Sequence, residues 1–170
     1  MAAPTYVLSE TNGATVVTDN IPTIAFASID SASTAGLSAA NPIQPSANAF
    51  EKYERLKCTG AATTQASAFS FYFPNQPVDS GATGSPNVVV NYSPSAGATY
   101  ATPVATNSIL ATAAVTTNTA PSGQTLTFAS AGVLNSYSGY MAFQLKFGAA
   151  VAGGPVNFNG NFLYIQYSWS

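Results

Sequence analysis

Apolar and polar side chains alternate in short runs along this chain, and turns rich in Gly, Pro and Asn separate the runs. The run 140–147 is the clearest, because its Met, Phe and Leu residues fall on one side and its Ala, Gln and Lys residues on the other. Residues 67–73 place Phe side chains on one face in the same way. Side chains of a β-strand point alternately to opposite faces, so both runs predict strands with one buried face. These two apolar faces are expected to be the facing layers of one core.

The remaining β-favouring segments are short and regularly spaced, and the chain has no segment with a convincing helical period. Residues 107–114 are ambiguous, since they fit either a short helical turn or a strand. The pattern predicts an all-β fold, and within that class a β-sandwich or a jelly roll. The expected strands are 5–8, 14–18, 23–29, 50–59, 67–73, 87–92, 99–104, 124–129, 140–147 and 162–169.

The first part of the chain contains a long segment without strand or helix periodicity. Residues 30–48 are mostly small and polar and include Pro42 and Pro45. Loops of this length are uncommon in compact domains unless they are functional or mobile. The segment is therefore either a surface loop or an arm that lies across a neighbouring subunit, with Ile43 as its apolar anchor. We divide the chain into an N-terminal arm with short strands, 1–49, and a β-sandwich domain, 50–170.

The strand predicted at 50–60 holds half of the charged residues of the chain, which has four Lys or Arg and six Asp or Glu. Tyr53, Arg55 and Lys57 share one face, whereas Lys52 and Glu54 interrupt the apolar face on the other side. We expect the charges to lie along an exposed face or a subunit contact and to form cross-strand ion pairs. The candidate contact residues of this strand are Glu51, Lys52, Tyr53, Arg55 and Lys57.

The last predicted strand, 162–169, is apolar on both faces. A strand of this kind is covered on both sides. One cover is the core, and the other is a second sheet, an arm or a neighbouring subunit. Tyr164, Tyr167 and Trp169 are therefore candidate contact residues.

Charged residues make up only 6% of the chain, against about 25% in ordinary soluble domains. So few charges give a monomer little electrostatic protection against self-association. Two interpretations remain open, a β-protein with a neutral polar surface or a subunit that buries much of its surface in an assembly. A net charge of −2 argues against nucleic-acid binding. The sequence contains no apolar run of transmembrane length and no signal-peptide pattern.

Few residues of this sequence are candidates for a catalytic role. The absence of histidine excludes Ser-His-Asp and Cys-His systems and most catalytic zinc sites. Glu51 and Glu54 lie next to cations, which favours ion pairing over a pair of catalytic carboxylates. The lone Cys58 is expected to be a small buried side chain. We therefore predict no enzyme activity, no cofactor and no metal site. Carbohydrate binding remains an alternative, through Tyr92, Tyr100, Tyr137 and Tyr140.

Five short motifs resemble those of a group of tailed-phage virion proteins. The segment FEKYERLKCTG at 50–60 precedes the aromatic strand ASAFSFYF at 66–73. A Tyr-x-Thr-Pro element follows at 100–103, then Ser-Gly-Tyr at 138–140 leads into MAFQLKF, and NFLYIQYSWS ends the chain. The likeness covers about residues 50–170, and the family includes capsid decoration, or cement, proteins.

This resemblance implies a non-enzymatic β-rich protein on the outer surface of a capsid, made in the host cytoplasm. The implied partners are the major capsid protein and copies of the chain itself, with a trimer as the favoured homo-oligomer. No nucleic-acid or membrane partner is expected. Two alternatives remain, a tail-fibre or receptor-binding module that recognises host glycan, and a major shell or tail-tube subunit.

Overall fold

A computed structural model describes residues 3–44, 47–60, 66–72, 88–92, 99–106, 124–147 and 163–169. Among these, it describes the backbone alone for residues 72, 88–92, 124, 146, 147 and 169. Nearly all regular structure in these ranges is β-strand, so the predicted all-β class is confirmed. The elements are β1 (Thr5–Asn12), β2 (Val16–Asp19), α1 (Leu37–Ala40), β3 (Lys52–Gly60), β4 (Ala66–Tyr72), β5 (Val88–Tyr92), β6 (Gln124–Thr125), β7 (Met141–Phe147) and β8 (Tyr164–Trp169).

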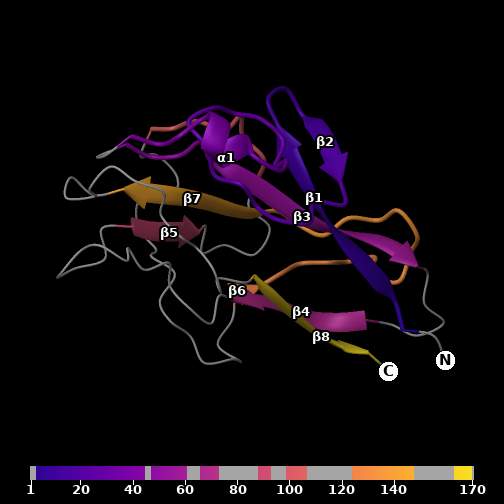
Figure 1. Cartoon of the computed structure of the whole chain (residues 1–170). Coiled ribbons are helices and arrows are strands. Elements are labelled where there is room, and N and C mark those ends of the chain that lie inside the picture. Colours follow the sequence, from indigo (N-terminus) through magenta and orange to yellow (C-terminus); the bar gives the residue numbers. More distant parts are fainter. Residues whose placement is uncertain are drawn as a thin grey trace.

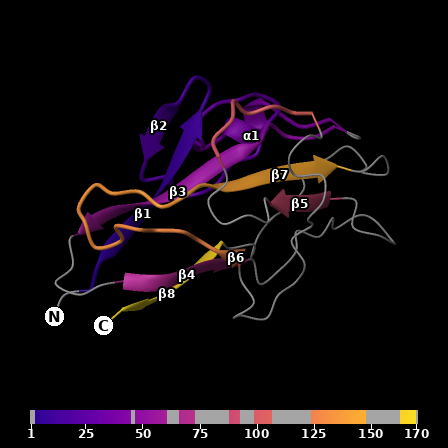
Figure 2. The same ribbon diagram turned by 180° about the vertical axis from the view of Figure 1, so that it is seen from behind.

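The strands form two antiparallel sheets, which Figures 1 and 2 show one above the other. The larger sheet has the order β2-β1-β3-β7-β5, and the smaller has the order β6-β4-β8. The two N-terminal strands thus belong to the same sheet as β3, which pairs with β1 along most of its length. This pairing brings β1 beside the charged strand, and it sets up the site described below.

The hydrophobic core lies between the two sheets. Phe69 and Phe71 of β4 pack in one cluster with Met141, Phe143 and Leu145 of β7, as the alternation of their sequences predicted. The rings of Phe71 and Phe143 meet edge to face, with their centroids 5.8 Å apart. Phe143 has no exposed surface. Because β4 and β7 belong to different sheets, this contact joins the two layers.

The strands predicted at 5–8 and 14–18 pair as the hairpin of β1 and β2, and β1 extends to Asn12. The register pairs Asn12 with Val16, so the turn comprises residues 13–15. Gly13 and Thr15 both have positive φ angles, 51° and 73°. Glycine enters the region of positive φ at little steric cost, which explains why a glycine starts this turn.

The segment 23–29 is not a strand, so that prediction was wrong. Its backbone groups bond to other parts of the chain at separate points instead of forming a ladder. The amide of Phe50 donates to the carbonyl of Ala27, the amide of Ser28 donates to Asn41, and the amide of Ala25 donates to the hydroxyl of Ser33. The segment therefore crosses the sheet as an irregular cover.

Three other predictions concern irregular segments. The connection 30–48 contains one helical turn, α1, which begins after Gly36 in a left-handed conformation (φ 82°). Residues 99–104 form no strand, and Pro103 within them has no N–H to give to a ladder. The ambiguous segment 107–114 lies outside the described residues.

Candidate functional site

The charged side chains of β3 divide between the two faces of the larger sheet. Register places Glu54 opposite Glu10 and Leu56 opposite Leu8, so these side chains share the inner face with Lys52. Arg55 lies opposite Ser9 and occupies the outer face. We call the inner group the buried charge cluster, defined as Glu10, Lys52 and Glu54.

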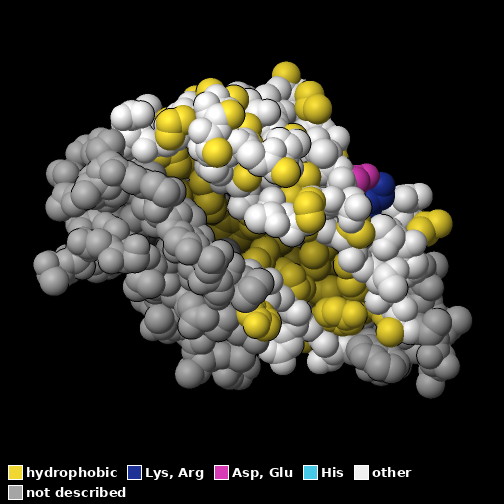
Figure 3. All heavy atoms as spheres, viewed as in Figure 1, with side chains coloured by type: hydrophobic (Ala, Val, Ile, Leu, Met, Phe, Trp, Pro, Cys, Tyr) yellow, Lys and Arg dark blue, Asp and Glu magenta, His cyan; other side chains and the backbone are white. Residues whose placement is uncertain are grey.

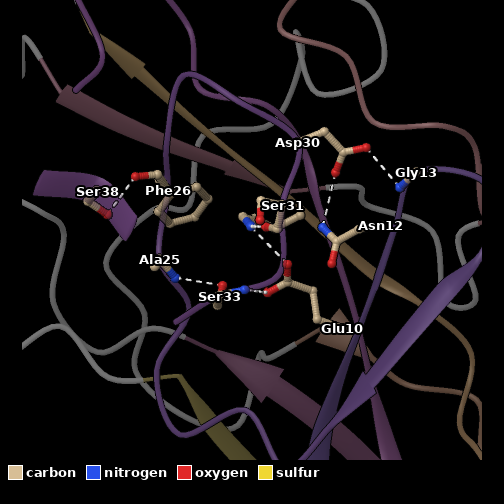
Figure 4. A network of polar contacts seen from close by, with 10 residues as sticks. Glu10, Asn12, Gly13, Ala25, Phe26, Asp30, Ser31, Ser33 and Ser38 are labelled. Atoms are coloured by element: carbon tan, nitrogen blue, oxygen red, sulfur yellow. Dashed lines mark hydrogen bonds and ion pairs between the residues drawn. The ribbon is translucent and has the colours of Figure 1, made fainter. Parts of the chain in front are cut away.

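An ion pair forms the centre of the buried charge cluster. The ammonium of Lys52 lies 2.8 Å from Oε1 of Glu10, and both side chains are fully buried. The same ammonium donates a hydrogen bond to the carbonyl of Ser31 at 2.6 Å. The amide of Ser33 donates to the other oxygen of Glu10 at 3.2 Å. Figure 4 shows how the irregular segment that carries both serines lies against the Glu10 carboxylate.

The expectation that the charges of β3 line an exposed face is wrong for its first half. Glu51, Lys52 and Glu54 have no exposed surface, and Tyr53 is 1% exposed. On the inner face, the irregular segment that contains Ser31 and Ser33 covers Lys52. On the opposite face, Tyr53 packs against Tyr100, Ala101 and Tyr140. The subunit contact proposed for these four residues stays a prediction, and their burial leaves them no accessible surface for it.

The surroundings of Glu54 favour its protonated form. Burial raises the pKa of this carboxyl well above its usual value of 4.5, the neighbouring Glu10 raises it further, and the charge of Lys52 only partly opposes them. A neutral Glu54 leaves one carboxylate and one ammonium in the cluster, which then balance. Buried ions need such compensation because their desolvation is costly.

This pKa predicts an unusual pH dependence of stability. Because the folded-state pKa of Glu54 is raised, its contribution is complete below pH 4.5 and is lost as the pH rises through the folded-state pKa. In that window one proton changes the free energy of unfolding by about 1.4 kcal/mol per pH unit. Glu54→Gln is expected to remove this slope and to be more stable than the parent at neutral pH. Urea denaturation at a series of pH values measures both.

Asp19 serves as a control, because its pKa is shifted in the opposite direction to that of Glu54. Although burial raises its pKa, hydrogen bonds from Lys57 and Ser9 and the charge of Lys57 lower it overall. Its contribution is therefore present above its usual pKa of 3.8 and is lost as the pH falls. Asp19→Asn should flatten only the acid side of the stability profile. An unchanged slope above pH 4.5 in Glu54→Gln would contradict the assignment to Glu54.

The outer face of β3 presents its two cations to one tyrosine. The guanidinium of Arg55 stacks on the ring of Tyr137 at 3.8 Å from the ring centroid, and it lies 5.0 Å from the centroid of Tyr140. Lys57 lies 5.6 Å from the centroid of Tyr137 and forms an ion pair with Asp19. Asp19 also accepts hydrogen bonds from Ser9 at 2.7 Å and from Tyr137 at 3.3 Å. We call Asp19, Arg55, Lys57, Tyr137 and Tyr140 the outer cation–tyrosine cluster.

The tyrosines considered for carbohydrate binding are engaged within the chain where their side chains are described. Tyr100 packs against Tyr53 and Tyr140, at centroid distances of 5.2 and 5.6 Å. The Tyr100 hydroxyl donates to the carbonyl of Gly13 at 2.6 Å, and the Tyr140 hydroxyl is hydrogen-bonded to that of Thr11. The side chain of Tyr92 lies outside the described residues.

The other predicted contact residues lie in different parts of the molecule. Ile43 is half-buried against the core between the sheets. Tyr167 stacks on Phe69 at 5.1 Å and is half-buried, whereas Tyr164 on the opposite face of β8 is 45% exposed. Trp169 pairs with Ala66 through the backbone, and its side chain lies outside the described residues. Cys58 is free and buried, as predicted.

Sequence reasoning missed Glu10, Asp19 and the segment around Ser31 and Ser33. The positions of these residues depend on the register of β1 and on the path of an irregular segment, and no sequence pattern indicates either of them. In the described ranges, no cluster of three or more Cys, Asp or Glu is placed to hold a metal ion. The described residues also include no helix that is long and apolar enough to cross a membrane.

Comparisons with protein-family models, with curated proteins and with solved structures found no match to this chain.

Proposed function

We propose that this chain is a non-enzymatic structural protein of a virion, which decorates or cements a phage capsid through contacts between subunits. The observation that carries the proposal is the near absence of free charge on the described surface. Glu10, Glu51, Lys52 and Glu54 are buried, and Asp19 is paired with Lys57. The fold thus removes four of the ten charged side chains of the sequence from contact with solvent, and two more form an ion pair with each other.

Apolar side chains occupy part of the surface that carries no charged side chain. On the face in Figure 3, charged side chains are confined to one small spot, whereas hydrophobic side chains are spread over the surface and line a hollow. In the part of the chain that the structure describes, the large hydrophobic side chains with at least 40% exposure are Val16, Val17, Ile29, Val133, Leu134 and Tyr164. Depletion of charge is the compositional mark of the centre of a protein interface.

The architecture fits such a role. We propose that the two packed sheets form a β-sandwich of the jelly-roll type, which supplies a rigid body for shell contacts. The partners would be the major capsid protein and further copies of the chain, with a trimer favoured, at the outer capsid surface. Burial of neutral and apolar surface would stabilise the shell by about 25 cal/mol per Å² of apolar area. The sequence resemblance to decoration proteins supports the phage assignment.

Binding to undecorated shells tests this proposal directly. The purified chain is expected to bind them in fixed stoichiometry and to raise their melting temperature, measured by calorimetry and electron microscopy. Val133→Glu, which places a charge on an exposed apolar position, should weaken binding, whereas Val133→Thr should weaken it less. A chain that leaves the melting temperature of shells unchanged is not a cement protein. A chain that polymerises alone into shells or tubes would instead be the major subunit.

A further inference from the structure

Arg55 differs from the other cations whose side chains the structure describes, because it has no carboxylate partner. Lys52 pairs with Glu10 and Lys57 pairs with Asp19, but no described carboxylate lies within ion-pair distance of Arg55. Its contacts are the rings of Tyr137 and Tyr140. A guanidinium has five N–H donors, and these normally find acceptors.

The two tyrosines hold this guanidinium in place without using its donors. Ring stacking occupies the face of the guanidinium and leaves its edge, where the N–H groups lie, open to a ligand. Nε of Arg55 is buried without a hydrogen-bond partner, while its two terminal nitrogens are not among the buried atoms and carry no hydrogen bond to a described residue. The fork of donors that binds a carboxylate in bidentate fashion is therefore preorganised.

The charge around Arg55 favours an anion. Within the outer cation–tyrosine cluster, two cations oppose the single carboxylate of Asp19, and hydrogen bonds from Ser9 and Tyr137 already occupy that carboxylate. The cluster therefore keeps one uncompensated positive charge.

We propose that Arg55 binds an acidic side chain of a neighbouring protein subunit, and this inference rests on the proposed assembly function. Exposed apolar residues lie close in sequence to two members of the cluster. Val17 on β2 precedes Asp19 by two residues and is 40% exposed. Val133 and Leu134 precede Tyr137 and are 59% and 52% exposed. Arginine and tyrosine beside apolar surface are the residue types that dominate binding energy at protein interfaces.

Two other occupants fit less well. A sugar ring stacks on an open aromatic face, but the ring of Tyr137 is stacked by Arg55 and that of Tyr140 packs against Tyr53 and Tyr100. A second copy of the chain would have to supply a carboxylate. The described carboxylates are buried, as Glu10, Glu51 and Glu54 are, or hydrogen-bonded, as Asp19 and Asp30 are. Since no carboxylate of the described ranges is free for this contact, the chemistry favours a different acidic protein as the occupant.

The test uses the full chain and two capped tripeptides, Ac-Val-Glu-Val-NH2 and its Gln counterpart, in a nuclear magnetic resonance titration of the Arg55 side-chain signals. The Glu peptide should shift them saturably, and the Gln peptide should bind about 10- to 100-fold more weakly, as expected for a hydrogen bond to a charged group. Arg55→Gln should abolish the Glu preference. Arg55→Lys, which keeps the charge but loses the fork, should reduce it, and thermal melts of both variants should show a folded chain.

Three results would overturn the inference. Equal binding of the two peptides would show that the carboxylate is not recognised. Tighter binding of glucuronate than of the Glu peptide would assign the site to an acidic sugar, and self-association that Arg55→Gln abolishes would assign it to a second copy. Because the titration uses no shells, its failure is distinct from a failure to bind capsids.

Discussion

Replacing Lys52 by Met is expected to lower the free energy of unfolding by about 3–5 kcal/mol, the usual cost of leaving a buried charge without its partner. The substitution nearly conserves volume, so packing contributes little to the loss. It removes the ammonium that lies 2.8 Å from Glu10 and also donates to the carbonyl of Ser31. Urea denaturation at neutral pH, followed by tryptophan fluorescence or circular dichroism, measures the change.

Lys57→Met on the same strand is the matched control. Lys57 also pairs with a carboxylate, Asp19, but the two side chains are 20% and 36% exposed. Water screens such a pair and solvates the partner that remains, so the loss should be far smaller than for Lys52. Equal losses for the two variants would contradict the burial of the Lys52 pair and the cover formed by Ser31 and Ser33.

Phe143→Ala is the second change with a large expected effect, a loss of about 3–5 kcal/mol in the free energy of unfolding. Phe143 is fully buried, and its ring meets that of Phe71 across the gap between the two sheets. Truncation leaves a cavity where the layers are joined, and the antiparallel strands on either side limit how far the site can collapse. Since domains are stable by only about 5–15 kcal/mol, this variant should be close to unfolding.

Val133→Ala provides the comparison for this experiment. Val133 is 59% exposed, and surface substitutions of this kind usually change stability by no more than about 0.5 kcal/mol. A Phe143→Ala variant as stable as Val133→Ala would mean that the two sheets do not share a core at this point. Calorimetry of both variants, under identical conditions, gives the difference directly.

The sequence predicted those parts of the fold in which a strand carries its own alternating pattern. Residues 140–147 and 67–73 fit this description, and their apolar faces meet as expected. The segment 23–29 was also predicted to be a strand, yet its hydrogen bonds go to Ser33, Asn41 and Phe50. Its state depends on contacts with distant residues, and a local pattern contains no information about them.

The candidate site was predictable only in its residue types. Lys52 and Glu54 visibly interrupt the apolar face of their strand, but charged residues are almost never fully buried unless paired. The partner that makes burial possible is Glu10, which lies 42 positions from Lys52 in sequence. Arg55 and Lys57 likewise share Tyr137, which only the path of the chain after β6 brings to them. Contacts between residues so far apart in sequence depend on the order of the strands and on the path of the connections between them.

Evolution can alter the buried ion pair of Glu10 and Lys52 only by changing both residues together. Losing Lys52 alone strands a carboxylate, and losing Glu10 alone strands an ammonium, so each single step passes through a poorly folded intermediate. Apolar replacement of Glu10, Lys52 and Glu54 together is expected to be tolerated, because well-packed hydrophobic residues often substitute for a buried ion group without loss. Descendants of this gene should therefore keep both Glu10 and Lys52 or exchange them together.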